Sequence, residues 1–179
     1  ILENNIAGVH LKQNNIPTAI SNYRRVIREF EKLLPPTDPL FITALNNLAT
    51  AHRKNNEPDL ARQQLETAAK FLGGPQGQQN DLLATVLNNL AIISSTEGAH
   101  QKAAQYYKRA YDIKRSIYGD NSVLLLDLIS NLAVTYWALD KPQEAIPLFK
   151  QAMRLATRQV AYVFPNLNED EQVQFYHKL

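Results

Sequence analysis

The apolar residues of this chain recur with the three- and four-residue spacing of an α-helix, and turn-forming residues interrupt the pattern at regular places. The motifs ALNNLAT, VLNNLAI and LISNLAV begin at residues 44, 86 and 128, so successive copies stand 42 residues apart. A fainter copy, NNIAGVH, begins at residue 4. A repeat of this length predicts an array of stacked units and not one globular domain.

Each repeat is predicted to be a helical hairpin. Small residues at fixed places let two helices approach closely, and a large residue between them fills the groove. The small residues are Ala19, Ala61, Ala103 and Ala145, followed by Val26, Ala68, Ala110 and Ala152, and the large ones are Tyr23, Leu65, Tyr107 and Phe149. We expect first helices at about 1–13, 38–55, 79–97 and 121–139, and second helices at about 16–34, 58–72, 100–118 and 142–164. The units are then about 1–36, 37–78, 79–120 and 121–164.

Composition narrows the class of protein without naming a function. The chain has 179 residues, of which 45% are hydrophobic and 20% charged, as expected for a soluble folded chain. The net charge of +2 gives no reason to expect nucleic acid as a partner, and no apolar run is long enough to span a membrane. The absence of cysteine excludes disulfides, thiolate metal sites and cysteine nucleophiles, and it fits a cytoplasmic protein.

The repeat pattern resembles the tetratricopeptide repeat, and more narrowly its 42-residue kinesin-light-chain type. The segments LNNLA, EAIPLFKQAM and YKRAYDIKRSIYGDNS carry this resemblance, which covers about residues 1–164. It implies an all-α, right-handed superhelical solenoid of about four hairpins, in which the first helix of each hairpin lines a concave groove. It also implies a non-enzymatic interaction module that binds a peptide or protein segment in that groove.

Two columns of polar residues are the main candidates for the binding site. In the family, the fifth and sixth positions of the first helix can border the concave face, and an amide side chain can both donate to and accept from a peptide backbone. The fifth position holds Asn4, Asn46, Asn88 and Ser130, and the sixth holds Asn5, Asn47, Asn89 and Asn131. An alternative role, open for both columns, is a side-chain hydrogen bond that ties neighbouring first helices together.

One helical turn further along, the family's groove positions fall on Lys12, Arg53, Lys54, Ser95 and Trp137. The three basic residues favour a partner with an acidic side chain or a terminal carboxylate. They could equally be solvated residues that interact with the carbonyl end of a helix. Trp137, the only tryptophan, is either a platform for the ligand or a packing residue against the fourth second helix or the tail.

No arrangement of residues supports catalysis, and we expect neither a cofactor nor a metal. His10 and His52 stand at equivalent places in neighbouring units, about 8–10 Å apart if the helices pack normally, which is too far to share one zinc ion. Core packing or groove lining is the expected role of both. The basic segments YRRVIR and YKRAYDIKR fall on second helices, where a solvated outer face is expected.

Besides the interaction module, two functional alternatives remain at the level of the sequence. Residues 165–179 lie outside the repeat and are expected to form a capping or linker helix, and FPNLNEDEQVQF resembles the linker before the caspase-like CHAT protease domain of bacterial proteins. The chain begins at Ile1 and not at Met, so we expect it to be a piece of a longer protein, and the array could regulate such a protease. The remaining alternative is an oligomerisation scaffold that self-associates through the exposed ends of the array.

Overall fold

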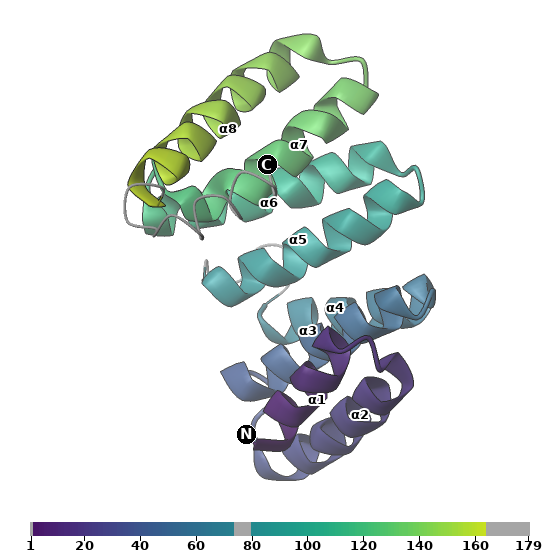
Figure 1. The fold of residues 1–179 in the computed structure, drawn as a ribbon. Helices are drawn as coiled ribbons and strands as arrows, with labels where there is room; N and C mark the ends of the chain where they lie inside the picture. Colours follow the sequence, from purple (N-terminus) through teal and green to yellow (C-terminus); the bar gives the residue numbers. More distant parts are fainter. Residues whose placement is uncertain (1, 74–79, 164–179) are drawn as a thin grey trace.

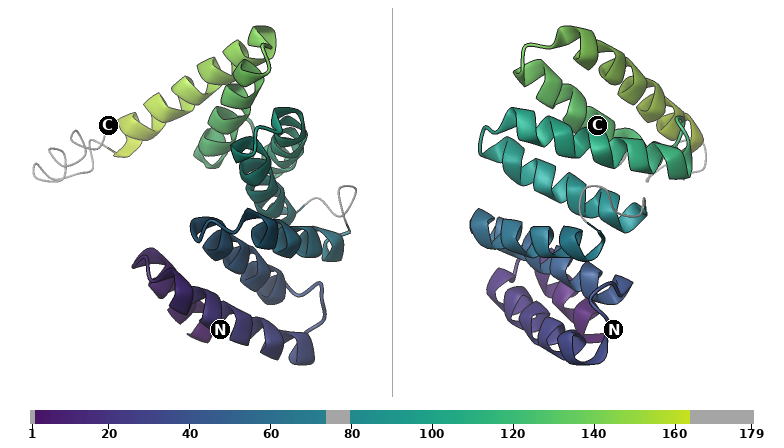
Figure 2. Two further views of the ribbon diagram at one scale, coloured as in Figure 1. Left: turned by 90° about the vertical axis from the view of Figure 1, so that its right-hand side faces the viewer. Right: turned by 180° about the vertical axis from the view of Figure 1, so that it is seen from behind.

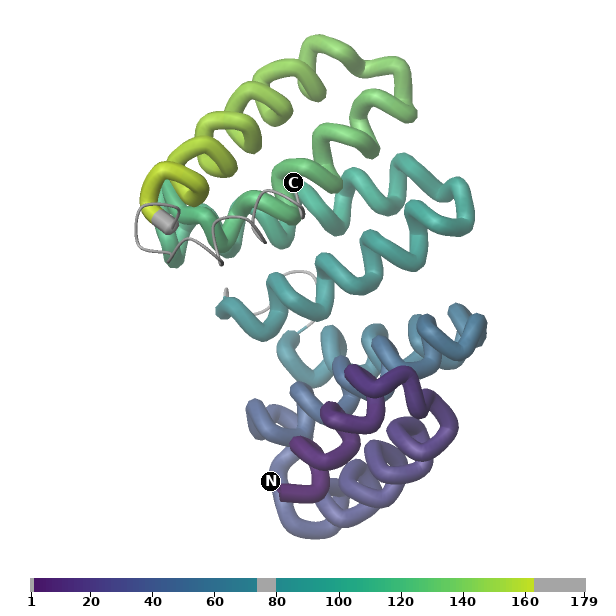
Figure 3. The backbone as a smooth tube through the Cα atoms, in the orientation of Figure 1, coloured from purple at the N-terminus to yellow at the C-terminus, as the bar shows by residue number. Residues whose placement is uncertain are grey.

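The computed structural model describes residues 2–73 and 80–163, and these residues form four consecutive pairs of antiparallel helices (Figures 1 and 3). The pairs are α1 (Leu2–Lys12) with α2 (Ile16–Leu33), α3 (Pro39–Lys54) with α4 (Pro58–Phe71), α5 (Asp81–Thr96) with α6 (His100–Tyr118), and α7 (Leu126–Ala138) with α8 (Pro142–Val163). The predicted all-α solenoid is therefore confirmed. The helix expected in the tail lies outside the described residues.

Each hairpin turns through one residue with left-handed backbone conformation. These residues are Asn14, Asn56, Gly98 and Asp140, with φ of 62°, 58°, 77° and 55°. They stand 42 residues apart, and they belong to the residue types that adopt this conformation at the lowest cost. The repeat thus specifies the turn as well as the two helices that it joins.

Side-chain hydrogen bonds cap the first turns of α3 and α5. The Asp38 carboxylate accepts from the Leu40 amide (2.8 Å) at the start of α3, and the Asn80 side chain accepts from the Leu83 amide (2.8 Å) at the start of α5. The expected helix at 121–139 is wrong at its start, because residues 123–125 form the 3₁₀ turn η2 before α7 begins. There the Leu125 amide donates to the Ser122 carbonyl three residues back (3.1 Å), which is the tighter 3₁₀ bond.

The core runs continuously through the array, as the small residues predict. The alanines at the closest approach of each helix pair are fully buried, and so are the large residues Tyr23, Leu65 and Tyr107. Phe149, at the equivalent place in α8, is exposed instead. Each hairpin packs closely against its neighbours, so most of its apolar side chains are buried only when the neighbouring hairpins are present.

The stack of hairpins is bent into an arc (Figure 2). On one side, α1 lies against α3 and α3 against α5. Between the second helices, by contrast, cavities open: about 320 Å³ between α2 and α4, 420 Å³ between α4 and α6, and 710 Å³ between α6 and α8. Helices on the inside of a bend are closer together than those outside it. The first helices α1, α3 and α5 therefore lie on the inner side. Among the described residues, no helix is long and apolar enough to cross a membrane.

Candidate protein-binding wall

The helices α1, α3, α5 and α7 are the first members of the four hairpins, and we call the surface that they present the A-helix wall. All twelve residues predicted to bind a partner lie on these helices. They are Asn4, Asn5 and Lys12 on α1, Asn46, Asn47, Arg53 and Lys54 on α3, Asn88, Asn89 and Ser95 on α5, and Asn131 and Trp137 on α7.

One pair of asparagines joins two helices of the wall. Asn89 Nδ2 donates to Asn46 Oδ1 at 2.7 Å, from α5 to α3. Asn46 is only 9% exposed, so its carbonyl oxygen would lack a partner without Asn89. The tie expected between neighbouring first helices is thus present, but it joins the fifth position of one hairpin to the sixth position of the next. Sequence spacing could not reveal this diagonal pairing, because it depends on the stagger between helices.

The remaining asparagines of the wall are less constrained. Asn47, Asn88 and Asn131 are partly exposed, and Asn5 is exposed. In residues 2–73 and 80–163, none of these four side chains makes a hydrogen bond. Their amide groups are therefore open to water or to a partner. Asn4 differs from Asn46, its equivalent, because its side-chain oxygen is buried and has no partner among the described residues.

The basic residues lie at the carbonyl ends of α1 and α3. Lys12 and Lys54 are exposed and Arg53 is partly buried. Burial raises the pKa of the Tyr107 hydroxyl on α6 to about 12, and the positive charge of Arg53 acts in the opposite direction. The Arg53 charge therefore acts on neighbouring hairpins as well as on its own helix end.

The apolar part of the wall is on α7. Trp137 is 61% exposed, so it is not packed into the interface with α8. Packing against α8 was part of one of its two predicted roles. Packing against the tail lies outside the described residues. Val134, one helical turn before Trp137, is 58% exposed and was absent from the predicted set. Helical spacing could have predicted that Val134 is exposed, because it stands three residues before Trp137 and therefore lies on the same face of the helix.

His10 and His52, at equivalent places in the first two hairpins, have different surroundings. His52 is buried in the core, and its Nδ1 lies 2.6 Å from Glu57 Oε2 in the turn after α3. This hydrogen bond, followed by one to Asn55, lowers the pKa of the Glu57 carboxyl. His10, the equivalent in α1, is partly exposed and has Asn15 where His52 has Glu57. No cluster of potential metal ligands occurs in the described part of the chain.

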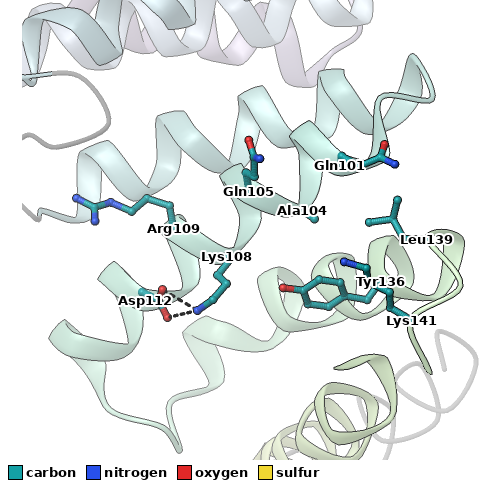
Figure 4. Close-up of a pocket in the computed structure, with 9 residues that line it drawn as sticks. All are labelled: Gln101, Ala104, Gln105, Lys108, Arg109, Asp112, Tyr136, Leu139 and Lys141. Atoms are coloured by element: carbon teal, nitrogen blue, oxygen red, sulfur yellow. Dashed lines mark hydrogen bonds and ion pairs between the residues drawn. The ribbon is translucent and has the colours of Figure 1, made fainter. Parts of the chain in front are cut away.

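The cavities lie away from the A-helix wall. One of about 430 Å³ lies between α6 and the end of α7, where Tyr136 faces Gln105 and the ion pair of Lys108 with Asp112 (Figure 4). None of the twelve predicted residues lines this cavity or the three between second helices described above. The residues predicted to bind a partner therefore lie outside these four cavities.

Paired helices that repeat every 42 residues and stack into an arc define a helical-repeat solenoid. The family model for the tetratricopeptide repeat matches residues 1–72 and 81–158. The chain therefore belongs to the tetratricopeptide repeat family, whose repeats generally mediate protein–protein interaction.

Solved structures agree with this assignment. BtubC (BKLC) from P. vanneervenii is 25% identical with a TM-score of 0.75, over 91% of this chain and 61% of that chain. The putative kinesin light chain repeats from Podosopora anserina are 18% identical with a TM-score of 0.76, over 87% of this chain and 74% of that one. MamA is 18% identical with a TM-score of 0.65, over 89% and 80% of the two chains. No curated protein sequence matches the chain. The kinesin-light-chain-like character of the repeats is thus confirmed.

Proposed function

We propose that the A-helix wall binds an extended segment of a partner protein. The observation that carries this proposal is the 61% exposure of Trp137 beside exposed Val134 on α7, the first helix of the fourth hairpin. Large apolar side chains that are left exposed on a surface are common at protein interfaces, where tryptophan often contributes most to affinity.

The chemistry of the wall changes along its length. Lys12, Arg53 and Lys54 favour an acidic residue of the partner near the first two hairpins. Asn88 and Ser95, both partly exposed, supply polar groups in the middle, and Trp137 supplies the apolar contact at the fourth hairpin. An extended segment with an acidic residue at one end and an apolar residue at the other fits this order. Asn46 and Asn89 hold the wall together and are not proposed to contact the partner.

A selection from phage-displayed random peptides on the 179-residue chain tests the proposal. Peptides that bind should lose affinity by about tenfold or more with Trp137→Ala, and by less with Asn88→Ala. Ile117→Ala, an exposed apolar residue of α6, is the matched control and should leave binding unchanged. Lys54→Glu should weaken binding more at low salt than at high salt, unlike Lys32→Glu in the last turn of α2. Selected peptides that are indifferent to Trp137, Asn88 and Lys54 would overturn the proposal.

A role as a regulator of a caspase-like domain rests on residues 165–179, which lie outside the described residues.

A further inference from the structure

The cavity of about 430 Å³ between α6 and the end of α7 is lined by an excess of positive charge. Its cationic side chains are Lys108 and Arg109 of α6 and Lys141 of the turn before α8. Asp112 is the one carboxylate among the described residues that line it. Three positive charges and one negative charge give the lining a formal charge of +2. A cavity of this size accommodates a small molecule or one side chain of a partner.

Two of the three cations have no partner in the described part of the chain. Lys108 is paired with Asp112, since its Nζ lies 3.0 Å from Oδ2 and 3.3 Å from Oδ1. The side chains of Arg109 and Lys141 make no ion pair or hydrogen bond within residues 2–73 and 80–163. The Nε atom of Arg109 is also buried. A buried donor without an acceptor costs free energy, so an acceptor supplied by a ligand would be favourable.

The starts of two helices lie beside the same cavity. Helix α6 begins one residue before the lining residue Gln101, and α8 begins one residue after Lys141. The first turn of a helix has unpaired amide donors and a partial positive charge, which favours an anion. Asp140 and Glu144 are close to Lys141 in the sequence, but neither of them lines the cavity. The helix starts therefore add to the positive charge of the side chains.

Tyr136 gives the cavity a flat apolar wall. Figure 4 shows its ring extending from α7 toward Lys108 and Asp112. Ala104 and Leu139 add further apolar surface. A tyrosine ring packs well against another aromatic group, and its hydroxyl can donate a hydrogen bond to an anion. The lining therefore fits a ligand that has an anionic head and a flat apolar body.

We propose that this cavity binds an aryl phosphate, with the phosphate at the cations and the aromatic ring against Tyr136. A phosphomonoester carries a charge of about −1.5 to −2 at neutral pH and so matches the +2 of the lining, whereas a carboxylate carries half as much. The guanidinium of Arg109 suits a phosphate because it can donate two parallel hydrogen bonds. The aryl phosphate is either a free small molecule or a phosphotyrosine of a partner protein. This site lies outside the twelve residues predicted to bind a partner, so it does not depend on the function proposed above.

Titration of the 179-residue chain with phenyl phosphate, followed by ligand-observed NMR, tests the proposal. Phenyl sulfonate has a similar shape and only one negative charge, so it is the matched ligand control. We expect it to bind at least about fivefold more weakly than phenyl phosphate. A short peptide with phosphotyrosine at its centre distinguishes the two sources. Binding about tenfold tighter than that of phenyl phosphate would identify a phosphorylated partner, and equal binding would identify a small molecule.

Three variants and a control locate the site on the chain. Arg109→Gln and Lys141→Gln should each weaken the binding of phenyl phosphate by about tenfold, and Tyr136→Phe by less, because each removes a donor to the phosphate. Lys102→Gln, an exposed lysine of α6 that does not line the cavity, should change binding by less than about twofold. Circular dichroism checks that all four variants remain folded. The proposal would be overturned by an absence of saturable binding, by equal affinity for phenyl sulfonate, or by binding that Arg109→Gln and Lys141→Gln leave unchanged.

Discussion

The hydrogen bond between Asn89 and Asn46 gives the sharpest test of what holds the A-helix wall together. Replacing Asn89 by Ala removes the donor and leaves Asn46 Oδ1, in a side chain that is almost fully buried, without a partner. An unsatisfied buried acceptor costs about 1–3 kcal/mol. Alanine is the better helix former by up to about 0.7 kcal/mol, which offsets part of this cost. We therefore expect Asn89→Ala to lower the free energy of unfolding by about 1–2 kcal/mol.

Asn88→Ala is the matched control, since it makes the same change one residue earlier in α5. Asn88 makes no side-chain hydrogen bond with the described residues, so only the gain in helix propensity applies. The melting temperature of Asn89→Ala, followed by circular dichroism, should fall by about 2–8 °C for a chain of this size. That of Asn88→Ala should stay the same or rise slightly.

A double-mutant cycle isolates the bond itself. Asn46→Ala, Asn89→Ala and the double variant, compared by urea unfolding, should show a coupling energy of about 0.5–1.5 kcal/mol. Equal melting temperatures for Asn89→Ala and Asn88→Ala, together with a coupling energy near zero, would refute the structural role of the pair. In that case both asparagines would return to the set of possible ligand contacts.

Three further predictions concern the hairpins. Leu65→Ala should destabilise the array by about 2–5 kcal/mol, because it leaves a cavity in the groove between α3 and α4, and urea unfolding measures this. Gly98→Ala should lower the free energy of unfolding by about 1–2 kcal/mol because φ is 77°, although no atom lies within 4 Å of the added methyl. Gly8→Ala, inside α1 and in ordinary contact with Tyr23, should not lower it. A similar loss of stability in both variants would contradict the argument. Hydrogen bonding to His52 lowers the pKa of the Glu57 carboxyl from its ordinary value of 4.5. The ionised carboxylate therefore stabilises the folded chain above pH 4.5, and this stabilisation is lost as pH falls through the lowered pKa. Melting temperatures of the unchanged chain and of Glu57→Gln, measured from pH 7 to pH 3, should therefore converge in acid, and a constant difference would count against the linkage.

The helices and their core could be predicted because the repeat constrains them several times over. An alanine recurs in all four hairpins at the point where the paired helices approach each other closely. All four residues are fully buried: Ala19, Ala61, Ala103 and Ala145. Among the described residues, the fourth hairpin differs from the prediction at Phe149, which is exposed, and at its start. There, the bond from the Leu125 amide to the Ser122 carbonyl closes a 3₁₀ turn before α7 begins, a detail that apolar spacing does not encode.

The candidate site was less predictable because its geometry depends on the relation between hairpins. Two asparagines adjacent in a helix point about 100° apart, so at most one of Asn88 and Asn89 can face the neighbouring helix. Which of the two does so depends on the stagger of α5 against α3, and this follows from the packing of whole hairpins. The exposure of Trp137 likewise depends on how the hairpins pack, which the sequence position alone does not reveal.

Comparison of the hairpins with one another separates two kinds of exposed apolar residue. Ile6 stands at a position that is apolar in all four hairpins and buried in the other three, so packing between helices demands an apolar side chain there. Trp137 stands at a position held by Leu11, Arg53 and Ser95 in the other hairpins. Packing does not demand one kind of side chain there, which leaves the position free to meet a partner, with different chemistry at each hairpin. Changes at this position should therefore alter which segment binds without altering the packing of the hairpins.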